Sequence, residues 1–135
     1  SGGMIVRHPD FEIFPFVFGR KDEKSPVTDV GHGDRFYMGT HYKGPHLFEY
    51  PKEWNGFTGY YRNDSPWVLG FRILMRQGKL WMDGVEALEP IQDGRFRPTS
   101  EAKSPEWISF HDSVNGQTQR ALFSGENYWR VSLAP

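Results

Sequence analysis

The chain has 135 residues with 16 basic and 17 acidic side chains, and its net charge of −1 argues against nucleic acid or an anionic membrane as the main partner. This length suits one domain with a single core. Aromatic residues supply 16% of the chain, and its 15 glycines and 10 prolines predict short strands rather than long helices. The absence of cysteine excludes disulfide scaffolds and thiolate zinc sites and leaves the cellular compartment open.

Residues 11–50 contain few segments with a strand pattern. Residues 11–18 are aromatic and β-prone, but Pro15 lacks a backbone donor, which predicts an edge strand or a bulge. Residues 19–34 are rich in charge and glycine and predict a long polar loop. Two short strand candidates follow, at residues 35–38 and 46–50.

The clearest strand pattern lies in residues 68–82. Alternation places Phe71, Ile73 and Met75 on one face of a strand, and Arg72, Leu74 and Arg76 on the other. The segment Gln77-Gly78-Lys79 then turns the chain, and residues 80–82 return as the second strand of a hairpin.

Further hairpins follow at regular spacing. Asp93-Gly94 and Asn115-Gly116 are favoured turn dipeptides, and each lies between two strand candidates. We therefore expect an all-β fold of eight to ten short strands with no helix beyond about two turns. An antiparallel up-and-down barrel of about eight strands accounts for this pattern, because closure removes exposed edges. Residues 1–3 look like an expression scar, and residues 4–135 are expected to form a single β-barrel domain with no membrane span, since no apolar run approaches the about 18 residues required.

A series of short motifs occurs in a fixed order from Trp54 onward. They are GYYRNDSPW (59–67), FRI (71–73), GKLW (78–81), GRFR (94–97), SPE (104–106), SG (124–125) and YWR (128–130). In this order they resemble the C-terminal domain of beta-lactamase-related serine hydrolases, relatives of penicillin-binding proteins. The resemblance covers residues 11–132 and is looser before Trp54; the polar insertion at residues 21–28 departs from it.

This resemblance implies a lipocalin-like barrel without settled activity and a catalytic domain of the same protein as its partner. It carries over no catalytic residue, because the nucleophile of the family belongs to the other domain. The leading hypothesis is therefore a non-catalytic accessory domain that packs against or modulates the catalytic domain. The alternative is a stand-alone barrel that binds a small apolar or anionic ligand in its interior.

Two local matches to the parent enzymes are interpreted as coincidental. Ser100 and Lys103 fit S-x-x-K, but they lie in a connection flanked by prolines, whereas the motif needs a helix to bring the amine to the hydroxyl. Tyr61-Arg62-Asn63 fits Y-x-N, but Tyr61 belongs to a strand candidate. We expect no catalytic residue in this chain.

The sequence gives no pattern for a metal or a cofactor. Among the five histidines, His41 and His46 are separated by a Gly44-Pro45 turn and have no carboxylate at a recognised ligand spacing. The glycines fall in hairpin turns and not between a strand and a helix, so no phosphate-binding loop is expected.

Arginines that neighbour aromatic residues are the candidate ligand-binding groups. Adjacent strand residues point to opposite faces, so one member of each pair faces inward. Outward arginines would be solvated, whereas inward ones need partners such as Glu106, Asp64 or tyrosine hydroxyls, or could bind an anionic ligand. The candidates for a small-molecule site are Arg62, Arg72, Arg97, Tyr128 and Arg130.

Five tryptophans offer a further possibility. Rings that remain exposed could stack on sugars or dock another domain, although a barrel core is the commoner place for such residues.

Overall fold

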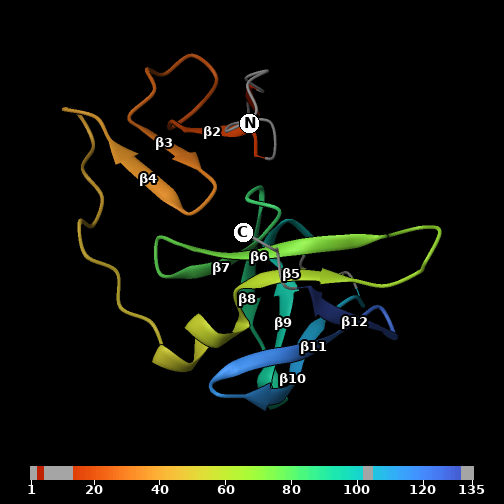
Figure 1. The fold of residues 1–135 in the computed structure, drawn as a ribbon. Coiled ribbons are helices and arrows are strands. Elements are labelled where there is room, and N and C mark those ends of the chain that lie inside the picture. The colour runs from red at the N-terminus through yellow and green to blue at the C-terminus, as the bar shows by residue number, and fades with distance from the viewer. Residues whose placement is uncertain (1–2, 5–13, 102–104, 132–135) are drawn as a thin grey trace.

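The computed structural model describes residues 3–4, 14–101 and 105–131. A four-stranded sheet comes first in the chain, and a closed barrel of eight antiparallel strands follows (Figure 1). In this view the sheet lies above the barrel, and the segment between them runs down the outside of the molecule. The predicted all-β barrel with little helix is confirmed.

The N-terminal sheet is antiparallel, and each strand pairs with the next one in sequence. Its strands are β1 (Gly3–Met4), β2 (Phe16–Gly19), β3 (Asp29–His32) and β4 (Arg35–Met38). Strand β2 begins directly after Pro15, while residues 11–13 of the expected strand and residues 1–2 lie outside the described part.

Strand β3 corrects the expectation of a polar loop over residues 19–34. Its sequence, Asp-Val-Gly-His, has little intrinsic strand preference, but it pairs on both sides, with β2 and with β4. Strand formation here depends on tertiary pairing, which a local propensity does not report.

The expected strand at residues 46–50 is also wrong, because residues 39–51 contain no strand. Pro45 and Pro51 lack backbone donors, and the Tyr42 hydroxyl donates to Pro45 O (2.9 Å), which holds the segment in a turn. The 3-10 helix η1 (Lys52–Phe57) follows and leads directly into the barrel.

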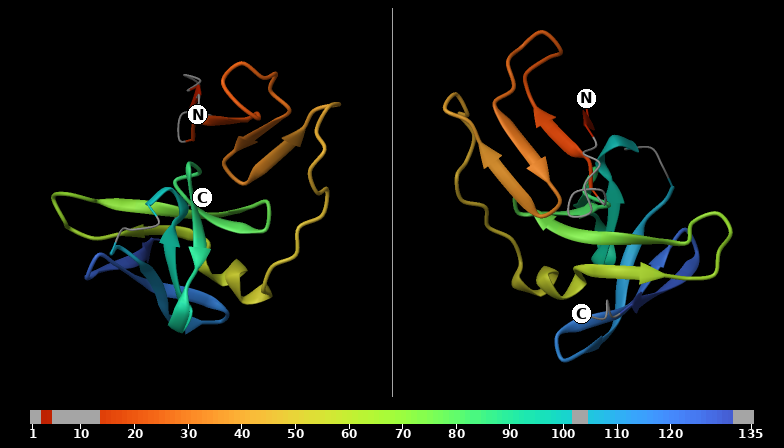
Figure 2. Two further views of the ribbon diagram at one scale, coloured as in Figure 1. Left: turned by 180° about the vertical axis from the view of Figure 1, so that it is seen from behind. Right: turned by 45° about the horizontal axis from the view of Figure 1, so that its top comes forward.

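The barrel is a plain meander whose last strand pairs with its first. Its strands are β5 (Gly59–Arg62), β6 (Gly70–Arg76), β7 (Lys79–Met82), β8 (Glu86–Pro90), β9 (Arg95–Pro98), β10 (Ile108–Val114), β11 (Gln117–Phe123) and β12 (Glu126–Val131). Pairing of β12 with β5 closes the barrel, with Arg130 opposite Tyr61. Two short 3-10 turns, η2 (Gln92–Gly94) and η3 (Thr99–Glu101), flank β9. Figure 2 shows the sheet and the barrel from two further directions.

The predicted hairpin turns are confirmed. Gln77–Gly78 joins β6 to β7 and Asn115–Gly116 joins β10 to β11, and all four residues have positive φ. This conformation matches the right-handed twist of the flanking strands, and glycine adopts it without strain.

Inward-facing side chains fill the barrel. Its core consists of Tyr61, Phe71, Ile73, Leu80, Leu88, Phe96, Ile108, Ala121 and Tyr128, all at most 3% exposed. Six further apolar side chains pack on them, and the rings are in contact: Phe57 stacks on Phe110 with centroids 4.5 Å apart, and Phe71 lies 4.9 Å from Tyr128. The alternation predicted for residues 71–75 is present, with Phe71 and Ile73 in the core and Met75 packed against it.

Candidate functional site

The structure distributes the five sequence-predicted site residues over different parts of the barrel. Arg62 is exposed on β5, and on β6 the Arg72 guanidinium lies 4.3 Å from the ring centroid of Tyr60. Arg97 on β9 pairs with Glu89, with 2.8 Å between Nε and Oε1. These three arginines alternate with core rings and therefore belong to the outer face.

Arg130 is the inward-facing member of its pair and binds the end of the barrel to η1. Its guanidinium donates to Thr58 O (2.8 Å) and Gly56 O (2.9 Å), and to Thr118 O. It also donates to the Tyr61 hydroxyl (2.9 Å). Because the guanidinium of Arg130 donates to backbone carbonyl oxygens and a hydroxyl of the protein itself, the geometry assigns Arg130 a structural role.

The Tyr61 hydroxyl lies between Arg130 and η1. It accepts from Arg130 and donates to Phe57 O at 2.7 Å. Burial raises the pKa of Tyr61 to about 12, although the positive charge of Arg130 acts in the opposite direction. Tyr61 is therefore neutral at ordinary pH, and its hydroxyl both donates and accepts a hydrogen bond within the protein.

Tyr128 combines a core ring with a hydroxyl near the polar side chains of its own strand. The ring is 2% exposed, and the hydroxyl lies 3.3 Å from Glu126 Oε2. Burial raises the pKa of this phenol too. Tyr128 and Arg130 are thus occupied by contacts within the barrel.

The structure gives Ser100 and Tyr61 separate partners. The Ser100 hydroxyl donates to Glu86 Oε1 (2.6 Å) on the exposed side of η3, whereas the Tyr61 hydroxyl is bonded to Phe57 O. Lys103, the other member of the S-x-x-K match, lies outside the described residues.

A serine–histidine contact on β10 was not anticipated from the sequence. Ser109 Oγ lies 2.6 Å from His111 Nε2, as expected for residues two apart on one strand face. Ser109 is only 5% exposed, which limits access to its hydroxyl. Within the described part of the chain, no cluster of three or more His, Asp or Glu side chains is placed to hold a metal.

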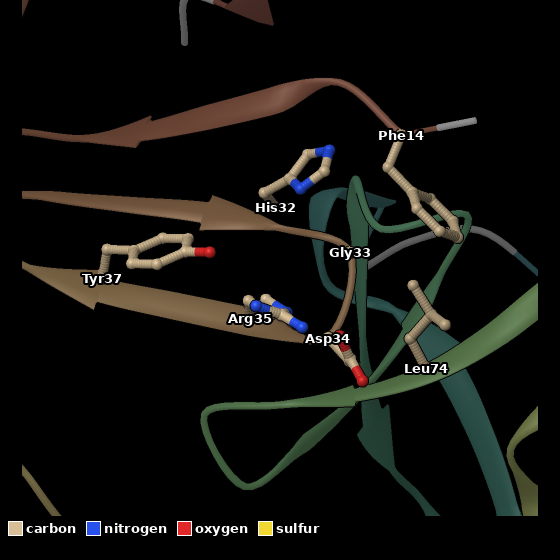
Figure 3. Close-up of a pocket in the computed structure, with 7 residues that line it drawn as sticks. All are labelled: Phe14, His32, Gly33, Asp34, Arg35, Tyr37 and Leu74. Carbon is tan, nitrogen blue, oxygen red and sulfur yellow. The ribbon is translucent and has the colours of Figure 1, made fainter. Parts of the chain in front are cut away.

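Two adjoining cavities lie between the N-terminal sheet and the outer wall of the barrel; we call them the sheet–barrel groove. One, of about 460 Å³, is lined by His32, Asp34, Arg35 and Tyr37 (Figure 3). The other, of about 480 Å³, is lined by Asn55, Thr58, Tyr60, Arg72 and Met75. Three residues line both cavities: Phe14, Asp34 and Leu74. Figure 3 shows Phe14 and Leu74 pointing toward each other where the sheet meets β6.

Arg76 joins the sheet to the barrel beside this groove. It is 2% exposed, its Nη1 donates to Gly33 O (2.8 Å), and its Cζ lies 4.0 Å from the Trp81 ring centroid. A Cβ at Gly31 would lie 2.7 Å from that Cζ, so the absence of a side chain lets β3 approach the guanidinium closely. Burial lowers the pKa of Arg76. The sequence placed Arg76 on the outer face but did not predict its burial.

His32, on β3, is a second buried polar residue beside the groove. Its ring stacks on Phe16 with centroids 4.4 Å apart, and Phe14 meets its edge at 6.5 Å. The burial of His32 was not predicted, because residues 19–34 were expected to form a polar loop.

An ordered loop between β5 and β6 presents apolar side chains to solvent. We call residues 63–69 the Trp67 loop; Trp67 is 90% and Leu69 59% exposed. Asn63 and Ser65 accept backbone N–H bonds within the loop, and Asn63 also donates to Asn127 O of β12. Trp129 on β12, 53% exposed, lies opposite Arg62 at the start of this loop.

These features place the accessible chemistry of the molecule outside the barrel. Arg72, the sheet–barrel groove and the Trp67 loop lie on its outer surface, while side chains occupy the interior. No helix within the described residues combines the length and the apolar character that crossing a bilayer requires. Comparisons with protein-family models, curated proteins and solved structures found no match to this chain.

Proposed function

We propose that this chain is a non-catalytic accessory domain of a beta-lactamase-related serine hydrolase and docks on the catalytic domain of that protein. The motif order from Trp54 onward supports the family, and the closed eight-stranded barrel is the fold that the resemblance implies. The observation that carries the docking role is the hydrogen-bonded, solvent-facing Trp67 loop.

The Trp67 loop has the composition of an interface centre. Tryptophan is enriched in interfaces, and a few such residues usually supply most of the binding energy. The hydrogen bonds of Asn63 and Ser65 fix the loop before binding, so little conformational entropy is lost when it docks. A second exposed tryptophan, Trp129 on β12, lies opposite Arg62 next to this loop.

The alternative, a ligand inside the barrel, has weaker support. Core residues such as Phe71, Phe96 and Tyr128 are at most 3% exposed, so a ligand there would have to displace packed rings. Closed barrels of eight strands are commonly filled by side chains or hold one small ligand, and the contacts of this core favour the first case.

The first test is the coding sequence upstream of Met4. We expect it to encode a helical domain with an S-x-x-K motif, and a frame without such a domain would contradict the proposal. Purified alone, the present chain should not hydrolyse chromogenic esters or β-lactams; turnover that is lost in Ser100→Ala would contradict its non-catalytic role.

The second test measures docking of the separated parts. The upstream domain and this chain are mixed in a calorimeter, and we expect Trp67→Ser with Leu69→Ser to weaken binding at least about tenfold. Val114→Ser is the matched control, since Val114 is 56% exposed in the β10–β11 hairpin. Equal loss in both variants, or absence of binding by the unaltered parts, would contradict docking through the Trp67 loop.

A further inference from the structure

We propose that the sheet–barrel groove binds a small amphipathic monocarboxylate, with the apolar body of the ligand against β6 and its carboxylate on Arg72. This site is separate from the Trp67 loop and does not depend on docking to another domain.

The apolar part of the groove is built from both regions of the molecule. Leu74 faces outward from β6, and Phe14 approaches it from the segment before β2 (Figure 3). Met75 lines the same cavity. The volume of about 480 Å³ lies within the range of small-molecule sites, roughly 300–1,000 Å³.

The Arg72 guanidinium is available for an anion. Arg95, Arg97 and Arg120 each pair with a carboxylate, whereas no carboxylate of the described residues forms a salt bridge with Arg72. Its side chain is half-buried and stacked on Tyr60, and its backbone N–H is bonded to Asp83 Oδ1 (2.8 Å). These contacts position the planar group at the cavity, where its N–H edge can bind a carboxylate through two parallel hydrogen bonds.

The remaining charges of the groove favour one negative charge on the ligand. Arg35 lines the adjoining cavity of about 460 Å³, and Asp34 lines both cavities. Arg72 is the cationic side chain that lines the cavity beside β6, and the nearby Asp83 carboxylate is bonded to the backbone N–H of Arg72. The Arg72 guanidinium is therefore the group that attracts an anion. The Asp34 carboxylate opposes a second negative charge on the ligand, so a monocarboxylate fits better than a dianion.

The test uses 4-phenylbutyrate as the probe and its neutral amide, 4-phenylbutanamide, as the matched ligand. Both are titrated into the ¹⁵N-labelled chain, and binding is followed by amide chemical shifts. We expect saturable shifts with the carboxylate in β5, β6 and the β3–β4 turn, and at least about tenfold weaker binding of the amide, since it lacks the charge. Absence of saturable shifts at millimolar carboxylate, or equal binding of the two compounds, would overturn the proposal.

Two variants test whether Arg72 supplies the positive charge that binds the carboxylate. Arg72→Gln should weaken 4-phenylbutyrate binding at least about tenfold, whereas Arg62→Gln, an exposed arginine on the neighbouring strand, should leave it unchanged. Equal affinity of Arg72→Gln and the unaltered chain would overturn the assignment. If the spectrum of Arg72→Gln shows unfolding, Leu74→Gln, which removes apolar contact from the outer face, takes its place and should also weaken binding.

Discussion

The barrel and the N-terminal sheet are stabilised in different ways. Each barrel strand pairs on both sides, and nine buried side chains form one core between them. Among the described residues, the sheet contributes no side chain to this core, and it meets the barrel through Arg76 with Gly33 and through Phe14 beside Leu74. At the barrel end and at the sheet, two barrel arginines donate to backbone carbonyl oxygens, Arg130 to Thr58 O and Arg76 to Gly33 O respectively.

A binding site can form only where packing leaves space between side chains. A core closed by packing leaves no room for a ligand, whereas a contact through a few side chains leaves spaces beside them. The sheet–barrel groove is such a space. We therefore expect the barrel to determine global stability and the sheet contact to determine ligand access.

The largest effect is expected from the barrel core. Phe71→Ala removes a ring that contacts Tyr61, Phe123 and Tyr128, and should lower the free energy of unfolding by about 3–5 kcal/mol. Urea denaturation measures it. Leu69→Ala, in the exposed loop of the same hairpin, is the control and should change stability by less than about 0.5 kcal/mol.

A somewhat smaller effect is expected from Arg130→Met. Methionine keeps an apolar stem but leaves several part-buried oxygens without their donor, and each lost partner costs about 1–3 kcal/mol at most. We expect a total loss of about 2–4 kcal/mol in urea denaturation. Arg62→Met, on the exposed face of β5, should be nearly neutral; a similar loss in both variants would show that Arg130 holds nothing specific.

Alkaline pH should weaken the barrel through Tyr61. Its pKa is raised to about 12 in the fold from an ordinary value of 10.0, so between these values the folded chain keeps a proton that the unfolded chain loses. The contribution is complete below pH 10 and is lost as the pH rises through the folded pKa, by roughly 1–3 kcal/mol in all.

Tyr61→Phe isolates that contribution. The variant should show a shallower loss of stability across the same pH range in urea denaturation, although it is less stable at neutral pH because Phe57 O and Arg130 each lose a partner. Identical slopes for the two proteins would contradict the assignment.

The smallest global effect is expected from Arg76→Met. This change removes the bond to Gly33 O and the contact with Trp81, and should increase hydrogen exchange in β3 about tenfold or more while β11 is unaffected. Uniform acceleration across both strands would show that the sheet and the barrel unfold together.

The sequence predicted most of the barrel because its signals are local. Alternation in residues 71–75 and the dipeptides at Gln77 and Asn115 determine strand faces and turns within a few residues. The strand at Asp29–His32 could not be predicted in this way, because its formation depends on pairing with strands on both sides.

The surroundings of the candidate site residues were harder to predict, because they too depend on contacts with distant segments of the chain. Alternation required one member of each arginine–aromatic pair to face inward, but it did not identify Arg130 as the inward arginine. Arg72 was among the candidates, whereas Arg76 is buried against a sheet from a distant part of the chain. Within that sheet, His32 packs on Phe16 of the neighbouring strand. The groove itself is a product of that contact and has no local signature.

Native-state hydrogen exchange of the unaltered chain measures the opening free energies of the sheet and the barrel separately. Exchange is followed amide by amide at increasing urea below the unfolding transition. We expect β2, β3 and β4 to exchange through an opening of lower free energy, and the barrel strands β6, β10 and β11 only through global unfolding. A single common opening free energy for both regions would contradict the account.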